Sequence, residues 1–111
     1  MTLLLPPSKN GKIDVRVYKL SKQAEQDLTA IWEYTVEQWN EAQADAYLQA
    51  IQSAMRLLID NPEIGTSREN IRTGYRSHCF GKHIIFYRSY SYGIRVIRIL
   101  HQSMECERHL L

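Results

Sequence analysis

The stretch from Gly74 to His101, GYRSHCFGKHIIFYRSYSYGIRVIRILH, decides the fold of this chain. Runs rich in Ile, Val, Phe and Tyr are typical of strands, and turn residues interrupt them at Gly81-Lys82 and again at 91–93. Short β-rich runs separated by tight turns indicate antiparallel strands that follow one another. The stretch therefore predicts a three-stranded antiparallel meander.

Positive charge gathers in the same half of the chain. Residues 61–111 hold 8 Lys and Arg against 4 Asp and Glu, whereas residues 1–60 hold 6 against 8. The basic half suggests an acidic partner, although so small an excess does not by itself predict nucleic-acid binding. The predicted meander ends in His101 and contains or adjoins five arginines: Arg72, Arg76, Arg88, Arg95 and Arg98.

Length and composition indicate one globular domain without a membrane segment. A chain of 111 residues with 44% hydrophobic and 23% charged residues is typical of a single soluble domain. No apolar run approaches the ~20 residues that a membrane span requires. The run Leu3–Leu5 is too short for a secretory signal and is followed at once by Pro6 and Pro7. We therefore expect a cytoplasmic protein.

The two cysteines, Cys79 and Cys106, form neither a metal-binding spacing nor a disulfide framework. Cys79 falls within a predicted strand, where a small buried apolar side chain is the expected role. A zinc site that joins both cysteines to His83 is disfavoured because paired-ligand spacing is missing. The sequence predicts no metal site and no cofactor.

The N-terminal residues predict a flexible tail followed by a strand. Residues 1–12 contain prolines, Asn10 and Gly11 without periodicity, so we expect a single domain over residues 13–111. Apolar and polar side chains alternate from Ile13 to Leu20, which is typical of a strand with one face in water.

Two apolar stripes with helical periodicity follow the strand. Ser21 is expected to cap the first helix at Lys22, and Asn40 to end it in a left-handed conformation. The second helix ends at Asn61-Pro62, because helical geometry is disfavoured before proline. So short a joint predicts an antiparallel hairpin. The stripes comprise Ala24, Leu28, Ile31, Trp32, Thr35 and Trp39, and then Ala44, Tyr47, Leu48, Ile51, Met55 and Leu58.

Residues 62–73 predict a loop, and residues 102–111 a short C-terminal tail whose Leu110 and Leu111 are expected to pack on the domain. The order of elements is strand, helical hairpin and three strands. This order predicts an α+β domain in which both helices cover one face of a mostly antiparallel sheet.

Six short segments, in this order and spacing, carry a family resemblance that covers Val15 to Leu110. They are LSKQAEQDL at 20–28 with Ile31 and Tyr34 after it, AQADAY at 42–47, NPEIG at 61–65, GYR at 74–76, HIIFYR at 83–88 and RILHQ at 98–102. Together they resemble the ParE branch of the ParE/RelE toxins, the toxic members of bacterial toxin–antitoxin pairs. The resemblance implies the RelE/ParE-like fold.

The resemblance also implies a function that composition alone does not. Toxins of this branch are understood to bind DNA gyrase, trap its cleaved DNA complex and block replication, without covalent chemistry of their own. An antitoxin similar to ParD neutralises them with a helical segment. The implied partners are a ParD-like antitoxin and DNA gyrase, with DNA contacted indirectly through gyrase.

Two binding surfaces follow from the resemblance. The antitoxin is expected to cover a groove beside the hairpin and to extend a sheet edge, with contacts at Leu28, Ile31, Tyr34, Tyr47, Ile51, Tyr90 and Tyr92. The surface that faces gyrase is expected at Arg72, Arg76, Arg88, Arg98, His101 and Met104.

The chain departs from the family pattern at three places. Asn40 stands where the family often has glycine, a change that the backbone absorbs. Ser103 stands where an arginine commonly follows the Leu-His-Gln segment, which weakens the expected target contact there. The tail of residues 1–12 is longer than usual.

A ribosome-dependent mRNA endoribonuclease of the RelE or YoeB type is the main alternative, because that branch cuts mRNA with the same fold. The reaction needs a proton carrier and cations around the phosphate, and His101 or His83 with Arg76 and Arg98 supply those residue types. Such nucleases commonly have an arginine directly after the histidine, where this chain has Ile84. A further alternative is an inactive member that only binds its antitoxin.

Simpler structural roles exist for the same side chains. A histidine that ends an apolar strand is more often packed and hydrogen-bonded than catalytic. Trp32 and Trp39 are expected in the core or between the helices, whereas Tyr90 and Tyr92 beside a turn are better interface candidates. Arg76 and Arg98 are suited to surface ion pairs with Glu63, Glu69 or Glu105.

Overall fold

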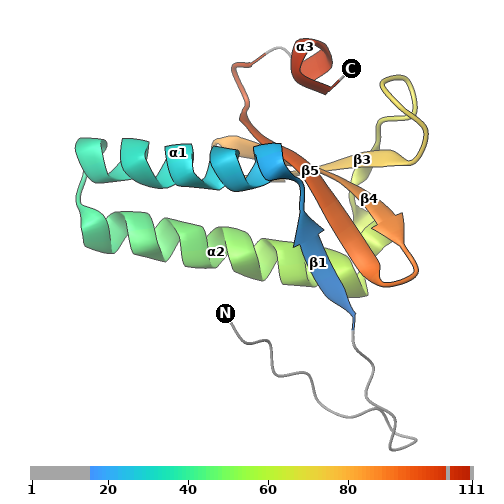
Figure 1. The fold of residues 1–111 in the computed structure, drawn as a ribbon, viewed down its shortest axis with the longest axis horizontal. Coiled ribbons are helices and arrows are strands. Elements are labelled where there is room, and N and C mark those ends of the chain that lie inside the picture. Colours follow the sequence, from blue (N-terminus) through green and yellow to red (C-terminus); the bar gives the residue numbers. More distant parts are fainter. Residues whose placement is uncertain (1–15, 105, 111) are drawn as a thin grey trace, which may run out of the picture.

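The computed structural model describes residues 16–104 and 106–110, which form a five-stranded sheet in the order β1-β5-β4-β3-β2 (Figure 1). The long helices α1 and α2 lie side by side on one face, and the short α3 lies beside the other. The elements are β1 (Val17–Leu20), α1 (Lys22–Gln38), α2 (Glu41–Asp60), a 3₁₀ turn (Pro62–Ile64), β2 (Thr66–Ser67), β3 (Tyr75–Phe80), β4 (His83–Tyr90), β5 (Gly93–His101) and α3 (Cys106–Leu110).

The predicted antiparallel meander is confirmed as β3, β4 and β5. Two-residue turns at Gly81-Lys82 and Ser91-Tyr92 connect the strands. Gly93 follows the second turn at a φ of 136°, and a Cβ there would lie 2.0 Å from the carbonyl oxygen of Val17. Glycine is required because β1 approaches the backbone of β5 at this point.

The strand β1 runs parallel to β5 and forms one edge of the sheet, while β2 forms the other edge. β1 begins at Val17, later than the predicted start at Ile13, and residues 13–15 lie outside the described part, as does the predicted tail at 1–12. Segment 62–73, for which the sequence predicts a loop, contains the 3₁₀ turn and β2. A two-residue strand is too short to show a periodicity.

The helical hairpin is confirmed, but the role predicted for Asn40 is wrong. Ser21 caps α1 as expected, because its Oγ accepts the Ala24 N–H at 3.0 Å. Asn40 is extended, with a φ of −170°, and its side chain accepts the Gln43 N–H at 2.8 Å. It therefore caps the start of α2 and does not end α1 in a left-handed conformation. Asparagine is suited to both roles, and its extended backbone with a side chain that accepts an N–H is that of an N-cap.

The main core lies between the hairpin and the sheet, so the prediction that both helices cover one face is confirmed. Trp39 is 74% exposed, which corrects its expected burial, because it follows the last residue of α1 where the hairpin extends past the sheet. Trp32 is half-buried and donates its Nε1–H to Asp45 of α2 at 3.0 Å. The largest fully buried side chains of this core are Ile51, Met55, Leu58, Ile85, Tyr87, Ile94 and Val96.

A smaller cluster on the opposite face consists of Ile71, Phe86, Leu100 and Leu110. Leu110 is 5% exposed, which confirms that it packs on the domain, whereas Leu111 lies outside the described residues. Cys79 is exposed, contrary to its predicted burial, because β3 lies near the sheet edge where this cluster does not cover it.

Candidate functional site

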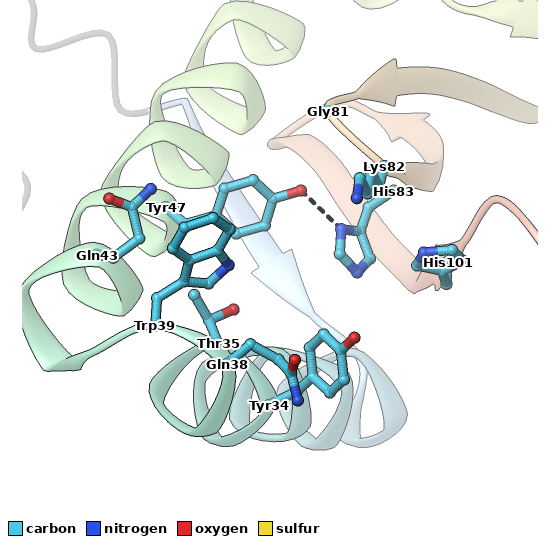
Figure 2. A pocket seen from close by; sticks show the side chains of 10 residues that line it. All are labelled: Tyr34, Thr35, Gln38, Trp39, Gln43, Tyr47, Gly81, Lys82, His83 and His101. Atoms are coloured by element: carbon cyan, nitrogen blue, oxygen red, sulfur yellow. Dashed lines mark hydrogen bonds between the residues drawn. The ribbon is translucent and has the colours of Figure 1, made fainter.

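A pocket of about 450 Å³ opens where the hairpin tip overhangs the end of the sheet (Figure 2). Its walls come from the end of α1, the start of α2, the turn between β3 and β4, and the end of β5. Helix and sheet elements that are distant in sequence thus meet around one concave surface. The lining residues are Tyr34, Thr35, Gln38, Trp39, Gln43, Tyr47, Gly81, Lys82, His83 and His101.

Tyr47 and His83 join the helical wall to the sheet wall. The Tyr47 hydroxyl lies 2.7 Å from His83 Nδ1. Burial raises the pKa of Tyr47, and a hydrogen bond from the Lys82 N–H offsets part of this rise. The hydroxyl accepts from the Lys82 N–H, and its hydrogen bond with His83 Nδ1 takes the direction that the tautomer of the imidazole sets. Gly81 permits this approach, since a Cβ there would lie 2.7 Å from the Tyr47 oxygen.

His83 and His101 meet edge to face, with ring centroids 5.5 Å apart. His101 Nδ1 accepts the Ser103 N–H at 3.1 Å and lies 2.7 Å from the Ser103 hydroxyl. Burial lowers the pKa of His83, charge on His101 lowers it further, and Asp27 raises it. His83 is therefore neutral at neutral pH.

The rim of the pocket is aromatic and open to solvent. Tyr34 is 64% exposed and Trp39 74% exposed, the highest values among the exposed large hydrophobic side chains of the described residues. Large aromatic side chains that are exposed beside a concave surface are typical of protein contacts. The pocket therefore combines a polar floor of histidine and tyrosine with an apolar rim.

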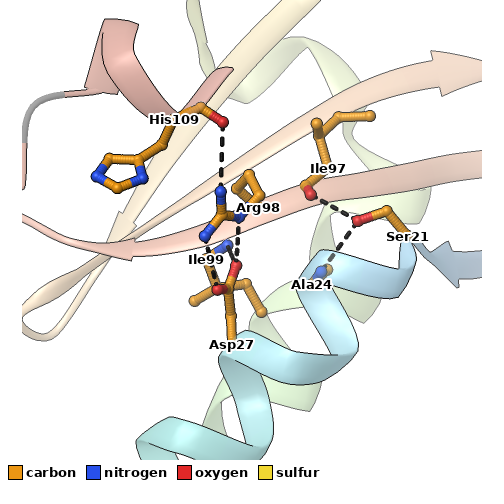
Figure 3. A network of polar contacts seen from close by, with 7 residues as sticks. All are labelled: Ser21, Ala24, Asp27, Ile97, Arg98, Ile99 and His109. Atoms are coloured by element: carbon orange, nitrogen blue, oxygen red, sulfur yellow. Dashed lines mark hydrogen bonds and ion pairs between the residues drawn. The ribbon is translucent and has the colours of Figure 1, made fainter. Parts of the chain in front are cut away.

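Arg98 is committed to a structural contact, and its partner is not one of the expected glutamates (Figure 3). Its Nε and Nη2 donate to the two carboxylate oxygens of Asp27 at 2.8 and 2.9 Å. The hydrogen bond with Asp27 raises the pKa of Arg98 above its ordinary value. Asp27 also accepts the Ile99 N–H at 2.9 Å, and Arg98 Nη1 donates to the His109 carbonyl at 3.3 Å. Arg98 therefore links α1, β5 and α3.

Arg76 and Arg72 also donate to backbone carbonyls. Arg76 Nη1 lies 2.7 Å from the Gly65 carbonyl oxygen, and Arg72 Nε lies 3.3 Å from that of Leu110. Arg76 is four residues before the end of β3 at the pocket, which places it about 13 Å away along the strand. The structure therefore does not bring Arg76 beside the histidine pair, as the nuclease alternative requires.

The six residues expected to face gyrase do not share one surface. Arg76 and Tyr87 are register partners, so Arg88, the next residue on β4, points to the opposite face of the sheet. His101 lines the pocket, and Met104 is 44% exposed just beyond it. The expectation of one continuous arginine surface is therefore corrected, because successive strand residues alternate between faces.

The residues expected to bind the antitoxin divide into three groups. Ile31 and Ile51 belong to the core, at 8% and 0% exposure, and Leu28 packs against it, so the assignment of the two isoleucines to a binding surface is corrected. Helical periodicity identifies the face that packs on the sheet, not the face a partner contacts. Of the others, Tyr34 and Tyr47 line the pocket, whereas Tyr90 and Tyr92 lie at the opposite end of β4.

Sequence reasoning missed several pocket residues. Trp39 lies at the joint between the two helices, directly before Asn40. A residue at the tip of a hairpin is the one most distant from the middle of the helices, and this position was the available signal that Trp39 lies beyond the sheet. Lys82 lies in a tight turn, and its place in the pocket depends on packing of that turn against the start of α2. The Tyr47–His83 contact, which makes this packing, joins residues 36 positions apart, and no local sequence pattern predicts it. The missed lining residues are Thr35, Gln38, Trp39, Gln43, Gly81 and Lys82.

The helical hairpin on one face of the five-stranded sheet is the RelE/ParE-like fold. Residues 18–106 match the family described as the ParE toxin of the type II toxin–antitoxin system parDE. The chain is 40% identical over 98 residues to Toxin ParE1 of Caulobacter vibrioides, which covers 86% of this chain and 99% of that protein. It is 42% identical over 94 residues to Toxin ParE1 of Mycobacterium tuberculosis, covering 84% and 96%. The chain belongs to the ParE toxin family.

Solved structures show the same fold at low sequence identity. The chromosomal ParDE system from P. aeruginosa matches with a TM-score of 0.66 and 22% identity, over 79% of this chain and 97% of that one. The E. coli DinJ–YafQ complex matches with a TM-score of 0.54 and 18% identity, over 79% and 94%. Among the described residues, no helix is long and apolar enough to span a membrane.

Proposed function

We propose that this toxin acts in the cytoplasm by binding DNA gyrase and blocking replication, and that a ParD-like antitoxin neutralises it. The observation that carries the proposal is the 40% identity to Toxin ParE1 over 99% of that protein's length. Binding requires an exposed surface but no assembled catalytic group. The segment from His101 to Met104, at the pocket mouth, is the proposed contact with gyrase.

The arrangement of cations supports binding over RNA cleavage. A phosphoryl-transfer site places cations around the reacting phosphate, and this charge stabilisation is usually its largest catalytic contribution. Here Asp27 holds Arg98, and the Gly65 carbonyl holds Arg76, which leaves Lys82 as the one lysine or arginine among the described residues that line the pocket. The position after His83, where nucleases of this fold commonly have an arginine, is Ile84. Ile84 supplies no cation and packs against the small apolar cluster on the opposite face of the sheet from His83. We therefore propose that the toxin is not an enzyme.

The antitoxin is proposed to insert an amphipathic helix into the pocket at the hairpin tip. Tyr34 and Trp39 offer apolar contact area on the rim, and Tyr47 and His83 offer polar atoms on the floor. An amphipathic helix in a groove is a recurrent mode of peptide recognition. Among the described residues, no strand pairs with the outer edge of β1, which is the proposed site for an added strand.

A supercoiling assay with purified gyrase tests the target. We expect the toxin to inhibit supercoiling and to accumulate cleaved DNA, and we expect prior addition of its antitoxin to prevent both. Met104→Ala should weaken inhibition, whereas Leu57→Ala, a comparably exposed apolar residue on α2, should not. Full supercoiling at a large molar excess of toxin would contradict the proposal.

The histidine cluster supports one alternative, an mRNA endoribonuclease with His101 as proton carrier. His101 lines the pocket and lies beside a second histidine. Its hydrogen bonds with Ser103 use Nδ1, so Nε2 is not engaged by Ser103. This alternative requires transcript cleavage on translating ribosomes that His101→Ala abolishes. Intact transcripts in a translating extract, together with inhibited gyrase, would reject it; growth of cells that express the toxin alone would indicate an inactive member.

A further inference from the structure

A second surface, on the face of the sheet opposite the hairpin, holds three cations that form no ion pair with any described residue. Lys19, Arg95 and Arg88 are register partners across β1, β5 and β4, so their side chains project from the same face. Lys19 and Arg95 are exposed and Arg88 is half-buried. Strands lie about 4.8 Å apart, so the three cations form a short row across the sheet. We call these residues, with Tyr90 and Tyr92, the basic tyrosine patch.

The cations of this row contrast with the other arginines of the meander. Within residues 16–104 and 106–110, no ion pair or side-chain hydrogen bond engages Lys19, Arg88 or Arg95. Arg98, Arg76 and Arg72 each bind a carboxylate or a carbonyl oxygen. Like charges directly opposite one another destabilise a sheet. The row therefore carries an electrostatic cost that a polyanion would relieve.

Two tyrosines complete the patch at the turn between β4 and β5. Tyr90 and Tyr92 are stacked, with ring centroids 5.3 Å apart and planes at 3°. Lys19 Nζ lies 4.3 Å from the centroid of the Tyr92 ring, and the Arg88 guanidinium lies 5.4 Å from that of Tyr90. Tyr90 is 40% exposed. The cation–π contacts orient the rings and leave each cation free to meet an anion.

We propose that the basic tyrosine patch binds single-stranded nucleic acid. A row of cations provides contacts for the phosphates of one strand, and the exposed Tyr90 ring beside the half-buried Tyr92 provides a surface on which a base stacks. An acidic peptide would satisfy the charges but not use the stacked rings. The patch lies seven residues along β4 from His83, about 24 Å from the pocket. The proposal does not depend on which cellular target the toxin inhibits.

Fluorescence anisotropy with a labelled single-stranded oligonucleotide of mixed sequence tests the proposal on the full chain. We expect R88Q/R95Q to lose at least tenfold in affinity and to reduce the salt slope by about 0.7 for each removed cation. Tyr90→Ala should lower the affinity for the single strand about fivefold or more, because base stacking on the ring is lost. Arg56→Gln, on the helix-covered side, is the charge control, compared with R88Q/R95Q per removed charge, and circular dichroism verifies folding of each variant.

Three results would overturn the proposal. The first is no binding at about 50 mM salt, where phosphate contacts are strong. The second is an equal loss of binding free energy per removed charge in Arg56→Gln and in R88Q/R95Q, which would indicate net charge alone. The third is displacement of the oligonucleotide by polyglutamate as readily as by unlabelled strand, which would identify an acidic-peptide surface. Preferential binding of the single strand over its duplex supports it.

Discussion

At the scale of single residues, Asp27 holds together parts of the chain that are far apart in sequence. β1 stops at Leu20, so within the described part of the chain no strand pairs with this edge of β5 beyond Val96. Ser21 and Asp27 of the hairpin take its place: Ser21 donates to the Ile97 carbonyl, and Asp27 accepts the Ile99 N–H. The same carboxylate binds Arg98, so one side chain satisfies a backbone donor and a cation.

Asp27→Ala is expected to lower the free energy of unfolding by about 2 kcal/mol, because it leaves the Ile99 N–H without its acceptor and leaves the half-buried Arg98 guanidinium with only the His109 carbonyl. The ion pair is partly exposed, with side-chain exposures of 17% and 14%, which keeps the cost below that of a fully buried pair. Urea denaturation monitored by circular dichroism measures it. Glu33→Ala, on the exposed side of α1, is the control and should change stability by less than about 0.5 kcal/mol.

His83 makes the stability of the toxin depend on pH. Its pKa in the folded state lies below the ordinary value of 6.5, chiefly because of burial and then because of His101. The unfolded chain therefore binds more protons than the folded one as the pH falls through 6.5, and folding is penalised. We expect the free energy of unfolding to fall as the pH is lowered from about 7 to 5.

Substitution at His83 isolates this contribution. His83→Gln should reduce the fall in stability with pH, whereas His78→Gln, a half-buried histidine on β3, should retain it. Urea midpoints at several pH values provide the comparison. Protonation of the carboxylates changes the stability of both variants equally, so it cancels in the difference between their pH profiles. Identical pH profiles for His83→Gln and the unsubstituted toxin would contradict the assignment.

At the scale of elements, the joint between α1 and α2 depends on Asn40 as an N-cap. Asn40→Ala is expected to cost about 1 kcal/mol, whereas Asn40→Gly should cost only a few tenths, since glycine is tolerated at an N-cap. A left-handed Asn40 would give another result, with glycine stabilising the protein. Thermal and urea unfolding of the two variants distinguish these conformations.

Local signals in the sequence predicted the elements, and long-range contacts decided their details. Ser21, Pro62 and the glycine turns act within a few residues, so the helices and the meander followed from the sequence alone. The Asp27–Arg98 pair joins residues 71 positions apart, and no local pattern distinguishes Asp27 from Glu63 or Glu69 as its partner. β2 is two exposed residues held by pairing with β3, and α3 packs on the sheet through Leu110, so neither element shows a periodicity of its own.

At the scale of the whole molecule, the strand β4 separates two candidate binding surfaces. His83, at one end, lines the pocket under the hairpin, and Tyr90, at the other end, belongs to the basic tyrosine patch on the opposite face. In the sequence, the histidines of the pocket and the arginines and tyrosines of the basic tyrosine patch all fall between Gly74 and His101. The alternation of strand side chains distributes them over two faces, which no count of charges reveals.

This separation predicts that the two surfaces can be disabled independently, because substitutions more than about 10 Å apart without shared contacts act additively. Trp39→Ala removes a 74% exposed side chain from the pocket rim and should weaken antitoxin binding at least tenfold while oligonucleotide affinity stays unchanged. R88Q/R95Q should weaken oligonucleotide binding and leave antitoxin affinity unchanged. Isothermal titration with the antitoxin and anisotropy with the oligonucleotide, on both variants and their combination, measure the four affinities. Loss of antitoxin binding in R88Q/R95Q would show that the antitoxin reaches around the sheet edge at β1 and covers both surfaces at once.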